Sequence, residues 1–340
     1  MMTALLLNHL RFRATAVTDV ILGEHYAGNN LRNALANMML HATCPEKQRG
    51  EKPTPEHAAV CQVCWLLAAE EDPGSVVRAY AVVPPQPPRQ VVRAGDSFAF
   101  GLTLFGDGWR FFPYIVLAAN EVGYSGVGPG RHEGKGRFHL DEIGAFNPLS
   151  SQNNQLLKRG ETLVKIAPVP VSFEDALMSS APLQDQVQQS KGELTIYFHS
   201  PTRLEKMNEQ GKKRPIRVPD FSVFFQRLLY RIDDLGRHFA HGEKRPKDEV
   251  LYLQGLADRV RLVNNDTEWV DLWSWSGRKR DRTPIGGLVG SATYQADEWG
   301  PLLPWLVFGQ GTQVGKSTPK GLGVYSIGGL QPSYWSWLRD

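Results

Sequence analysis

Two glycine-rich runs lie at matching places in the two halves of this chain, and they constrain its fold more than any other feature. The first covers residues 123–136 and the second covers residues 309–323. Glycine is needed where the backbone turns with positive φ or approaches another segment closely. The chain holds 33 glycines and 23 prolines among 340 residues, an excess over average usage. Much of the glycine excess therefore lies in these two segments, where the backbone must turn or pack closely.

The first glycine-rich run completes a pattern of alternating strands and helices. The predicted helices carry apolar residues at spacings of three and four, and the predicted strands alternate or are bounded by proline. The segment that contains residues 44–60 is polar and rich in proline, and we expect it to be a loop. The expected order is a strand at 3–17, a helix at 29–40, strands at 76–83 and 97–104, a helix at 109–122 and a strand at 137–143.

The second half repeats this order. The expected elements are a strand at 193–199, a helix at 221–240, strands at 270–275 and 290–295, a helix at 299–308 and a strand at 324–327. Two βαββαβ units predict an α+β chain of two tandem ferredoxin-like (RRM-like) domains. We place the N-terminal domain at residues 1–150 and the C-terminal domain at 191–340. Residues 151–190 are expected to connect them, with a short strand at 162–168.

Charge and hydropathy exclude several protein classes. The 38 Lys and Arg residues nearly balance the 35 Asp and Glu residues, for a formal charge of +3, which excludes an acidic disordered chain and a histone-like tail. No window approaches the ~18 consecutive apolar residues of a membrane span, and residues 1–7 lack the basic flank of a signal peptide. We expect no membrane partner and a cytoplasmic location.

The second glycine-rich run contains a sequence similar to a phosphate-binding P-loop. Gly315, Lys316 and Ser317 give the Gly-Lys-Ser ending, but Gly309 lies one residue too far upstream, and Pro319 and a strand follow where a helix is required. Nucleotide hydrolysis is therefore not expected. The loop's free backbone N–H groups, with Lys316 and Lys320, still suit phosphate oxygens. The alternative is that both glycine-rich runs are flexible turns.

Several stretches of the chain carry distinctive motifs. They are Asn30 to Leu35, Leu194 to Leu204 (LTIYFHSPTRL), Phe221 to Arg231, Pro284 to Tyr294 (PIGGLVGSATY), Leu302 to Pro304, and Gly309 to Tyr325, which contains the Gly321-Leu322-Gly323 ending. Together they resemble the CRISPR-associated RAMP endoribonucleases, in the Cas6 branch that processes repeat RNA, whose C-terminal half carries a glycine-rich loop ending in Gly-hydrophobic-Gly before the last strand. The chain is similar to that branch over essentially its whole length.

The resemblance implies an endoribonuclease that cleaves CRISPR precursor RNA within its repeats to give mature guide RNA, and it leaves open whether the product is retained. The implied reaction needs no metal: a ribose 2′-OH attacks the adjacent phosphate and leaves a 2′,3′-cyclic phosphate and a 5′-OH. Other Cas effector subunits are possible partners. The alternative is a catalytically inactive RAMP-fold subunit that binds RNA within an effector complex.

Such cleavage needs a base, an acid and a cation or donor for the phosphorane. Histidine suits the first two roles because it titrates near neutral pH, and the resemblance implies a site near the loop and helix after the first strand. The first candidate is His25, with Tyr26 positioning the substrate, and His41 is the alternative. His25 could equally be an ordinary loop histidine. His9 is expected to be structural, and His199 is a minor candidate.

The three cysteines give a second, competing role to His41. His41 and Cys44 form an HxxC pair, and Cys61 and Cys64 form a CxxC pair. Two such pairs are typical of a structural zinc site, and His57 could replace His41 as the fourth ligand. Some relatives carry four cysteines here, whereas this chain has none near residues 68–69. Zinc binding and a set of buried thiols therefore both remain open. If His41 binds zinc it is not the general base.

Basic residues define the expected RNA contacts. Short basic loops occur at 212–217 and 278–282, and Trp269, Trp273 and Trp275 precede the second one, a combination that suits stacked bases and phosphates. The alternative, which we favour for the tryptophans, is a solvated turn with the tryptophans in the core. The predicted RNA-binding residues are Arg203, Lys212, Lys213, Arg278, Lys279, Arg280, Arg282, Gly315, Lys316, Ser317 and Lys320.

Overall fold

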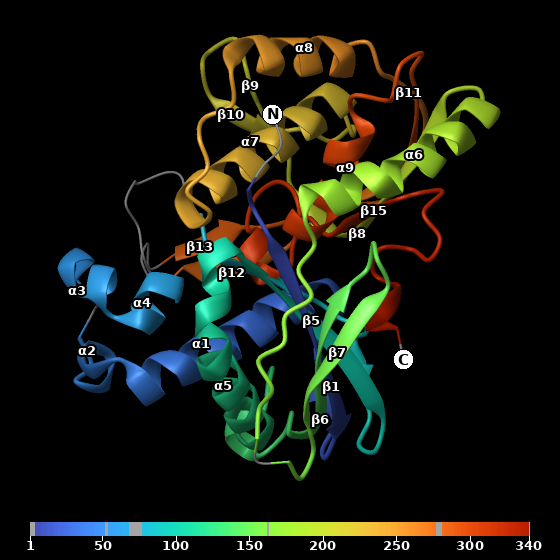
Figure 1. The fold of residues 1–340 in the computed structure, drawn as a ribbon. Coiled ribbons are helices and arrows are strands. Elements are labelled where there is room, and N and C mark those ends of the chain that lie inside the picture. The colour runs from blue at the N-terminus through green and yellow to red at the C-terminus, as the bar shows by residue number, and fades with distance from the viewer. Residues whose placement is uncertain (1–3, 52–53, 68–76, 162, 277–280, 340) are drawn as a thin grey trace.

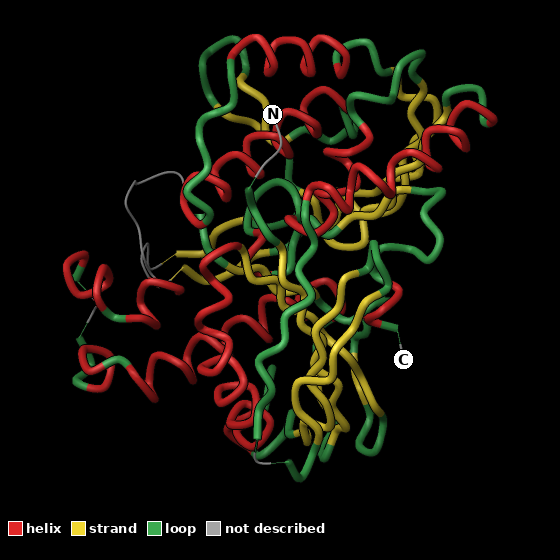
Figure 2. Tube along the Cα trace, in the orientation of Figure 1, coloured by secondary structure: helices red, strands yellow, loops and turns green. Residues whose placement is uncertain are grey.

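The computed structural model describes residues 4–51, 54–67, 77–161, 163–276 and 281–339. Its strands gather in two groups, one from each half of the chain, and the helices lie around them (Figures 1 and 2). This is the expected α+β architecture of two tandem ferredoxin-like units. The division at residues 150 and 190 remains a prediction.

The sheet of the first half has five antiparallel strands, with β1 at its centre. β1 pairs with β5 on one side and with β6 on the other, and β3 and β7 form the edges. Alternate residues of β1, such as Leu10, Phe12 and Ala14, are fully buried, as a strand with one face on the core requires. The strands are β1 (Leu7–Ala16), β3 (Tyr80–Val83), β5 (Ser97–Phe105), β6 (Phe138–Asn147) and β7 (Gln152–Lys158).

The sheet of the second half repeats this arrangement. Its order places the second, third, first and fourth core strands side by side, as in the first sheet, and all pairs are antiparallel. The βαββαβ repeat predicted from sequence is thereby confirmed in the strand order. The strands, in spatial order, are β11 (Arg261–Val270), β14 (Gly287–Gln295), β8 (Glu193–Thr202) and β15 (Tyr325–Ile327).

Four helices occupy the crossover positions of the two units. α1 (Ala27–Thr43) and α5 (Phe112–Ser125) pack on each other in the first half, and α7 (Phe221–Phe239) and α9 (Leu303–Gly309) do so in the second. α7 begins at Asp220, whose side chain accepts a hydrogen bond from the Val223 N–H. Its apolar stripe from Phe221 to Leu235 is buried, so burial of one face stabilises it.

One hydrophobic core runs through both halves. Gln313 of the second half donates to the Val82 carbonyl of β3 at 2.8 Å, and a Cβ on Gly28 would lie 2.8 Å from the Cα of Gly321. The backbone of α1 therefore touches the second glycine-rich loop directly, which only glycine permits. The two halves form a continuous body around this contact.

The two glycine-rich loops close in the same way. In the first loop the Val127 N–H donates to the Gly136 carbonyl at 3.0 Å, and in the second loop Val314 donates to Gly323 at the same distance. Gly136 and Gly323 have φ of +75° and +77°, and a Cβ on either would lie within about 2 Å of the facing valine carbonyl oxygen. Both loops are therefore ordered structures, and the flexible-turn alternative is wrong.

Residues 147–190 differ from the expected linker. β7 extends the first sheet, and α6 (Phe173–Gln189) packs on α9, while the described residues 163–168 form no strand. Ser172 and Asp175 make a reciprocal capping box at the start of α6. Pro182 and the Ser- and Gln-rich composition concealed this helix, because proline normally disfavours a helix interior.

The second half contains elements that the sequence pattern did not predict. β11 is mostly exposed and polar, so it lacks the alternation of a half-buried strand. It lies at the edge of its sheet and pairs with β14 along its whole length. α8 (Lys247–Ala257) precedes it, and the hairpin of β12 (Trp273–Ser276) and β13 (Asp281–Pro284) follows it. The predicted strand at 270–275 is therefore only part of a longer hairpin system.

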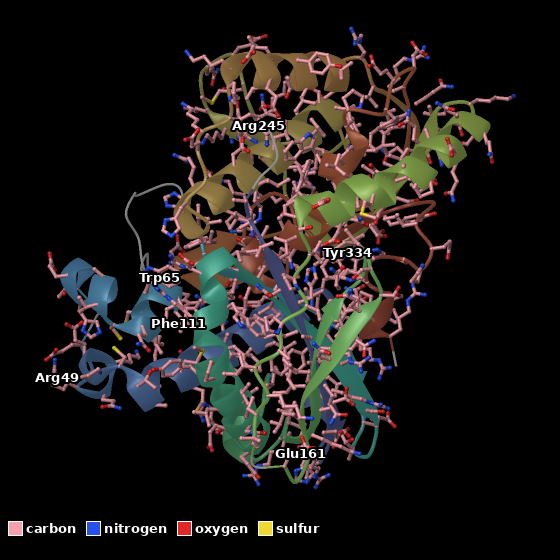
Figure 3. The ribbon with its side chains drawn as sticks, in the orientation of Figure 1. Arg49, Trp65, Phe111, Glu161, Arg245 and Tyr334 are labelled. Atoms are coloured by element: carbon pink, nitrogen blue, oxygen red, sulfur yellow. The ribbon has the colours of Figure 1, made fainter. Side chains whose placement is uncertain are left out.

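The expected loop at 44–60 is instead a compact helical knuckle. Pro45 and Pro55 occupy the first turns of two short helices, where the missing N–H costs nothing. Trp65 anchors the knuckle next to Phe111 (Figure 3). Its ring centroid lies 5.0 Å from that of Phe111 and 4.6 Å from the guanidinium of Arg110. The helices are α2 (Pro45–Gln48), α3 (Pro55–Val60) and α4 (Gln62–Leu67). Within the described ranges, no helix is both long and apolar enough to cross a bilayer.

Candidate functional site: a histidine-lined groove beside a cysteine cluster

The helical knuckle brings all three cysteines together with one histidine. The possible ligand atoms of Cys44, His57, Cys61 and Cys64 lie within 4.8 Å of one another. The Cys44 Sγ is 3.3 Å from the His57 Nε2 and 3.5 Å from the Cys64 Sγ. His41 does not belong to this group, so of the two predicted alternatives for a fourth ligand the geometry places His57 with the thiols.

The spacing of these atoms suits a tetrahedral metal. Zinc–sulfur bonds of about 2.3 Å and zinc–nitrogen bonds of about 2.0 Å place tetrahedral ligand atoms roughly 3.5 to 3.8 Å apart. The distances around Cys44 are within a few tenths of an ångström of these values. The Glu46 carboxylate lies 3.5 Å from the His57 Nδ1, so it can orient that ring as carboxylates do in zinc sites. Without a metal, burial and hydrogen bonds with Cys44 and Cys61 raise the pKa of Cys64.

His41 lies on α1, one turn before the knuckle. It is exposed and shares a helix face with Ala34, Asn37 and Met38, at spacings of three and four. The last turn that carries it is fixed, because the Gln48 amide donates to the His41 carbonyl at 3.0 Å and the Cys44 N–H donates to the Leu40 carbonyl at 3.0 Å. The helix therefore presents His41 outward on an ordered turn.

This face of α1 forms one wall of a groove of about 340 Å³. The end of α5 contributes Val122, Ser125 and Gly126, and the first glycine-rich loop contributes Arg131 and His132. The 3₁₀ turn of Arg131–Glu133 is held between Gly130 and Gly134, both in the left-handed conformation. The Arg131 Nε donates to the His132 Nε2 at 3.4 Å. Two histidines and one arginine thus line one solvent-open groove.

His25 and Tyr26 lie at the opposite end of α1. From Tyr26 to His41 the helix rises about 22 Å, at 1.5 Å per residue, so the two cannot act on one phosphate. His25 lies in the 3₁₀ turn of Glu24–Tyr26, with its Nε2 3.8 Å from the Glu24 carboxylate. Its Nδ1 is buried and has no hydrogen-bond partner among the described residues.

The N-terminal end of α1 meets the β12–β13 hairpin and the second glycine-rich loop (Figure 1). The Lys320 Nζ donates to the Ser274 Oγ at 2.8 Å, and the Ser274 hydroxyl lies 3.4 Å from the Asn29 Oδ1. Burial, together with the nearby charge of Arg32, lowers the pKa of Lys320. Lys320 thus links three segments that are distant in sequence.

The same loop continues onto a basic and aromatic surface. The Lys316 N–H donates to the Arg203 carbonyl at 3.1 Å, and its side chain lies 3.8 Å from the Glu205 carboxylate. The guanidinium of Arg217 stacks on Trp269 at 3.9 Å, and that of Arg203 lies 5.8 Å from the same ring. The structure therefore places Gly315, Lys316 and Ser317 beside Arg203. Lys316 and Ser317 are followed by a 3₁₀ turn and β15, as expected for a sequence that is no P-loop.

The remaining basic candidates lie on two hairpins. Lys212 and Lys213 are exposed on the hairpin of β9 (Glu205–Met207) and β10 (Lys213–Pro215). Arg282 is exposed on β13 opposite Trp275. Trp273 and Trp275 are 56% and 63% exposed, so the preferred core placement was wrong for both. The predicted residues Arg278, Lys279 and Arg280 lie outside the described residues.

His9 is buried and His199 is half-buried. The two ring nitrogens of His9 lie 2.8 Å from the Thr103 and Tyr334 hydroxyls, and burial lowers its pKa to about 3. The Nε2 of His199 lies 2.7 Å from the Ser326 hydroxyl, and burial with the charge of Arg339 lowers its pKa to about 4. Both are structural histidines.

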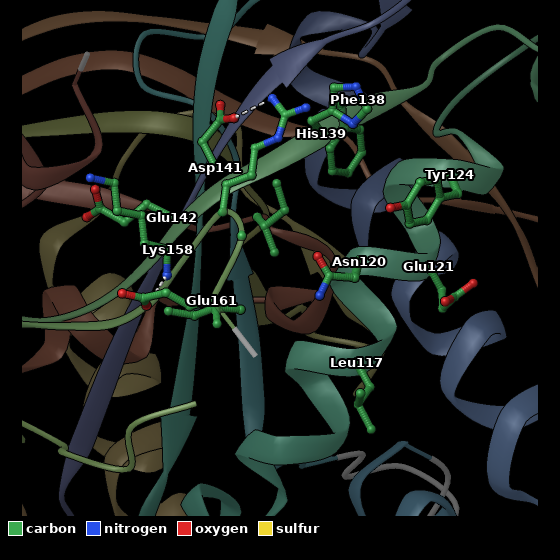
Figure 4. Close-up of a pocket in the computed structure, with 14 residues that line it drawn as sticks. Leu117, Asn120, Glu121, Tyr124, Phe138, His139, Asp141, Glu142, Lys158 and Glu161 are labelled. Atoms are coloured by element: carbon green, nitrogen blue, oxygen red, sulfur yellow. Dashed lines mark hydrogen bonds and ion pairs between the residues drawn. The ribbon is translucent and has the colours of Figure 1, made fainter. Parts of the chain in front are cut away.

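A further hollow of about 360 Å³ lies between α5 and the β6–β7 edge (Figure 4). It is lined by four carboxylates, those of Glu121, Asp141, Glu142 and Glu161, against Lys158 and Arg159. Arg159 lies 3.6 Å from the Asp141 carboxylate. Because negative charge prevails, this hollow does not suit an RNA phosphate.

Arg131 and His132 are the site residues that sequence reasoning missed. They lie within the first glycine-rich run, about 90 residues after His41, and no local spacing connects them with α1. The available signal was a histidine and an arginine inside a loop that was itself singled out for close backbone approach.

Each half of the chain matches a known protein-family model. The family model of the CRISPR-associated endoribonuclease Cas6 matches residues 196–325. A second family model, described as an N-terminal domain, matches residues 5–169. The second half of the chain therefore carries a CRISPR-associated Cas6 endoribonuclease domain. The resemblance to the RAMP endoribonucleases is thereby confirmed, and endoribonuclease activity is the activity of the family.

Solved Cas6 structures share the fold of the whole chain. A Cas6 product complex is 16% identical and has a TM-score of 0.56, with 94% of this chain and 98% of that chain covered. A Cas6 from Thermus thermophilus is 14% identical with a TM-score of 0.53, at the same coverage. A partial Cas6-RT-Cas1–Cas2 complex is 15% identical with a TM-score of 0.58, covering 95% and 46%. No sequence among the curated proteins matches this chain.

Proposed function

We propose that this Cas6 protein cleaves CRISPR precursor RNA within its repeats, without a metal ion in the reaction. The single observation that carries the proposal is the groove in which His41, His132 and Arg131 meet. Two imidazoles and a guanidinium supply what ribose-mediated cleavage requires, namely proton transfer at two oxygens and a cation for the phosphorane. The expected products are a 2′,3′-cyclic phosphate and a 5′-OH.

His41 is the first catalytic residue we assign to this groove. His57 completes the cysteine group, so His41 is available for chemistry, and its exposure allows RNA to reach it. The catalytic role first predicted for His25, with Tyr26 positioning the substrate, stays a prediction, and both residues lie at the other end of α1. They precede Gly28 and Asn29, which contact the second glycine-rich loop and the β12–β13 hairpin, so this end of α1 suits RNA contact.

The RNA would extend from the basic and aromatic surface of the second half along α1 to the groove. Arg203, Arg217 and Lys316 provide phosphate contacts near Trp269, and Trp273 and Trp275 offer exposed faces for stacking. A net charge of only +3 means that binding relies on these local groups. The repeat RNA and the mature guide RNA are the partners that this surface would hold.

Two solved relatives are described as a Cas6 product complex and as part of an assembly with Cas1 and Cas2. We extend both properties to this chain as proposals, so that product retention and association with other Cas subunits are expected. A catalytically inactive RNA-binding subunit would use the same surface but would not need the two-histidine groove.

We propose a structural zinc ion for the knuckle, held by Cys44, His57, Cys61 and Cys64. The ligand distances and the Glu46–His57 contact support it. When bound, zinc would keep the thiols deprotonated and would hold α2, α3 and α4 together. The ion has no place in the cleavage step.

Product-end analysis tests the cleavage proposal. Purified protein is incubated in EDTA with a repeat RNA carrying a single 2′-deoxy substitution, walked along the repeat. We expect one position at which the substitution abolishes cleavage, and a 2′,3′-cyclic phosphate on the unmodified product. A 3′-hydroxyl product, or no cleavage of any unmodified repeat, would favour a hydrolytic nuclease or the inactive subunit respectively.

A further inference from the structure

His132 faces the same groove as His41 but comes from a different part of the chain. Its 3₁₀ turn is fixed by two left-handed glycines, and both Arg131 and His132 are exposed. The sequence alone gave no role to this turn. Its chemistry nevertheless complements that of His41, because the cleavage moves two protons and an imidazole can take one while a second imidazole gives the other.

We propose that His132 is the general base of RNA cleavage, that His41 is the general acid, and that Arg131 neutralises the phosphorane. This inference rests on the proposed function and assigns the groups within the same groove. His132 and His41 are catalytic residues in this account, because both would touch reacting oxygens of the RNA.

The direction of proton transfer follows from the contacts of each ring. The His132 Nε2 accepts a hydrogen bond from the Arg131 Nε at 3.4 Å, so the lone pair of the neutral ring is on this nitrogen, and it becomes free to take the 2′-OH proton when Arg131 turns to the phosphate. His41 lies in the last turn of α1, where the carbonyl end of the helix carries partial negative charge and favours a cation. His132 is therefore placed to accept a proton and His41 to hold one.

The groove has room for the reacting part of the RNA. Its volume of about 340 Å³ is within the range of ligand pockets, roughly 300–1,000 Å³. Ala34 and Met38 on one wall and Val122 on the other are apolar, so they can contact the ribose. The histidines line the groove from two different segments, one on α1 and one on the loop, so one can serve the attacking oxygen and the other the departing oxygen.

The proposed cleavage transfers two protons, forms one phosphorus–oxygen bond and breaks another. His132 takes the 2′-OH proton, the O2′ forms a bond to phosphorus, and the phosphorus–O5′ bond breaks. The departing O5′ receives the proton of His41, which gives the 5′-OH and leaves the other product with a 2′,3′-cyclic phosphate. Arg131 interacts with the non-bridging oxygens while they carry the extra charge. Water restores the two protonation states.

A sulfur leaving group separates the two roles. RNA with a 5′-bridging phosphorothiolate at the cleavage site releases a thiolate, which needs no general acid. We expect His41→Ala and His132→Ala to slow single-turnover cleavage of ordinary RNA by about 100-fold to 10,000-fold. On the sulfur substrate, His41→Ala should approach the wild-type rate, whereas His132→Ala should remain slow. His241→Ala is the control, because His241 is exposed next to Asp107 and lies outside the groove.

The outcomes are distinct. A His132→Ala variant that cleaves ordinary RNA at the wild-type rate overturns this inference, while the loss in His41→Ala would still support the proposed function. Rescue of His132→Ala instead of His41→Ala, or of neither variant, overturns the assignment of base and acid. Failure of the wild-type protein to cleave ordinary repeat RNA would remove the proposed function itself. Circular dichroism and metal content should match those of the wild type in both variants.

Discussion

The Nε2 of His57 lies 3.3 Å from the Sγ of Cys44. This contact separates two roles that compete for His41 in the sequence. His57 reaches the thiols from α3 and turns its other nitrogen toward Glu46, whereas His41 faces a groove on the outer side of α1. The candidate metal site at Cys44 and the candidate catalytic residue His41 are thus only one helical turn apart, but no residue belongs to both sites.

The knuckle should bind one zinc ion per chain. Elemental analysis of purified protein is expected to give about one equivalent, and His57→Ala should lower this sharply, because three thiolates alone leave a tetrahedral site open. His41→Ala is the matched control and should keep the full equivalent. Less than a tenth of an equivalent in the wild type, or loss of zinc in His41→Ala with retention in His57→Ala, would contradict the assignment.

The closure of the second glycine-rich loop should make Gly323 intolerant of any side chain. A Cβ there would lie 1.9 Å from the Val314 carbonyl oxygen, so Gly323→Ala is expected to lower the free energy of unfolding by more than 3 kcal/mol, about 1–2 kcal/mol of which is left-handed strain. Gly211→Ala is the control, because Gly211 has φ of +71° but no atom within 4 Å of a Cβ. It should show only the strain. If urea denaturation shows the same loss of unfolding free energy for Gly323→Ala and Gly211→Ala, Gly323 does not pack against Val314 as described.

Charged and aromatic groups of the RNA surface should differ in their response to salt. Lys316→Ala is expected to reduce the slope of log K against log salt by about 0.7, the contribution of one phosphate contact on single-stranded RNA. Trp275→Ala should leave the slope unchanged and weaken binding by about 1–3 kcal/mol, as loss of base stacking does. Filter binding of a non-cleavable repeat from 50 to 300 mM salt measures both. Unchanged binding in either variant would remove that residue from the surface.

Stability should fall in mild acid because the fold holds two histidines neutral, one buried and one half-buried. The pKa of His9 is lowered to about 3 and that of His199 to about 4, against about 6.5 unfolded. Protonation therefore favours the unfolded chain. Stability is full above pH 6.5 and is lost as pH falls toward those values, at about 1.4 kcal/mol per pH unit for each histidine.

His9→Gln should remove one of these two contributions. The slope of unfolding free energy against pH, measured in urea between pH 6 and 4.5, is expected to fall by about 1.4 kcal/mol per unit. The comparison of slopes does not depend on how much the variant loses at pH 7. An unchanged slope would mean that His9 is protonated in the folded protein.

The fold was predictable where the sequence pattern and burial coincide. The stripe from Phe221 to Leu235 predicted α7, and the glycine-rich runs predicted the loop positions in both units. The edge strand β11 was not predictable, because its exposed polar residues follow no alternation and only pairing with β14 makes it a strand. α6 had a readable start at Ser172 and Asp175, but Pro182 outweighed that signal.

Some residues of the candidate site were also predictable from the sequence, and others were not. Cys44, Cys61 and Cys64 stood out by spacing, and His57 was a named alternative, but only the packing of α3 on α4 places it with the thiols. The groove depends on contact between α1, α5 and a distant loop, so the only sequence signal for its second histidine was its place inside a glycine-rich run, and no spacing linked it to α1. Local motifs were therefore readable, whereas a site built across elements required the fold.

The most direct test of the central claim is the single-turnover rate of repeat-RNA cleavage in EDTA by wild type, His41→Ala and His25→Ala. We predict that wild type cleaves once per repeat, that His41→Ala is at least 100-fold slower while it keeps its RNA affinity and zinc, and that His25→Ala stays within about tenfold of wild type. A His41→Ala variant that cleaves as fast as wild type, with His25→Ala inactive, would contradict the groove as the catalytic site and move it to the other end of α1.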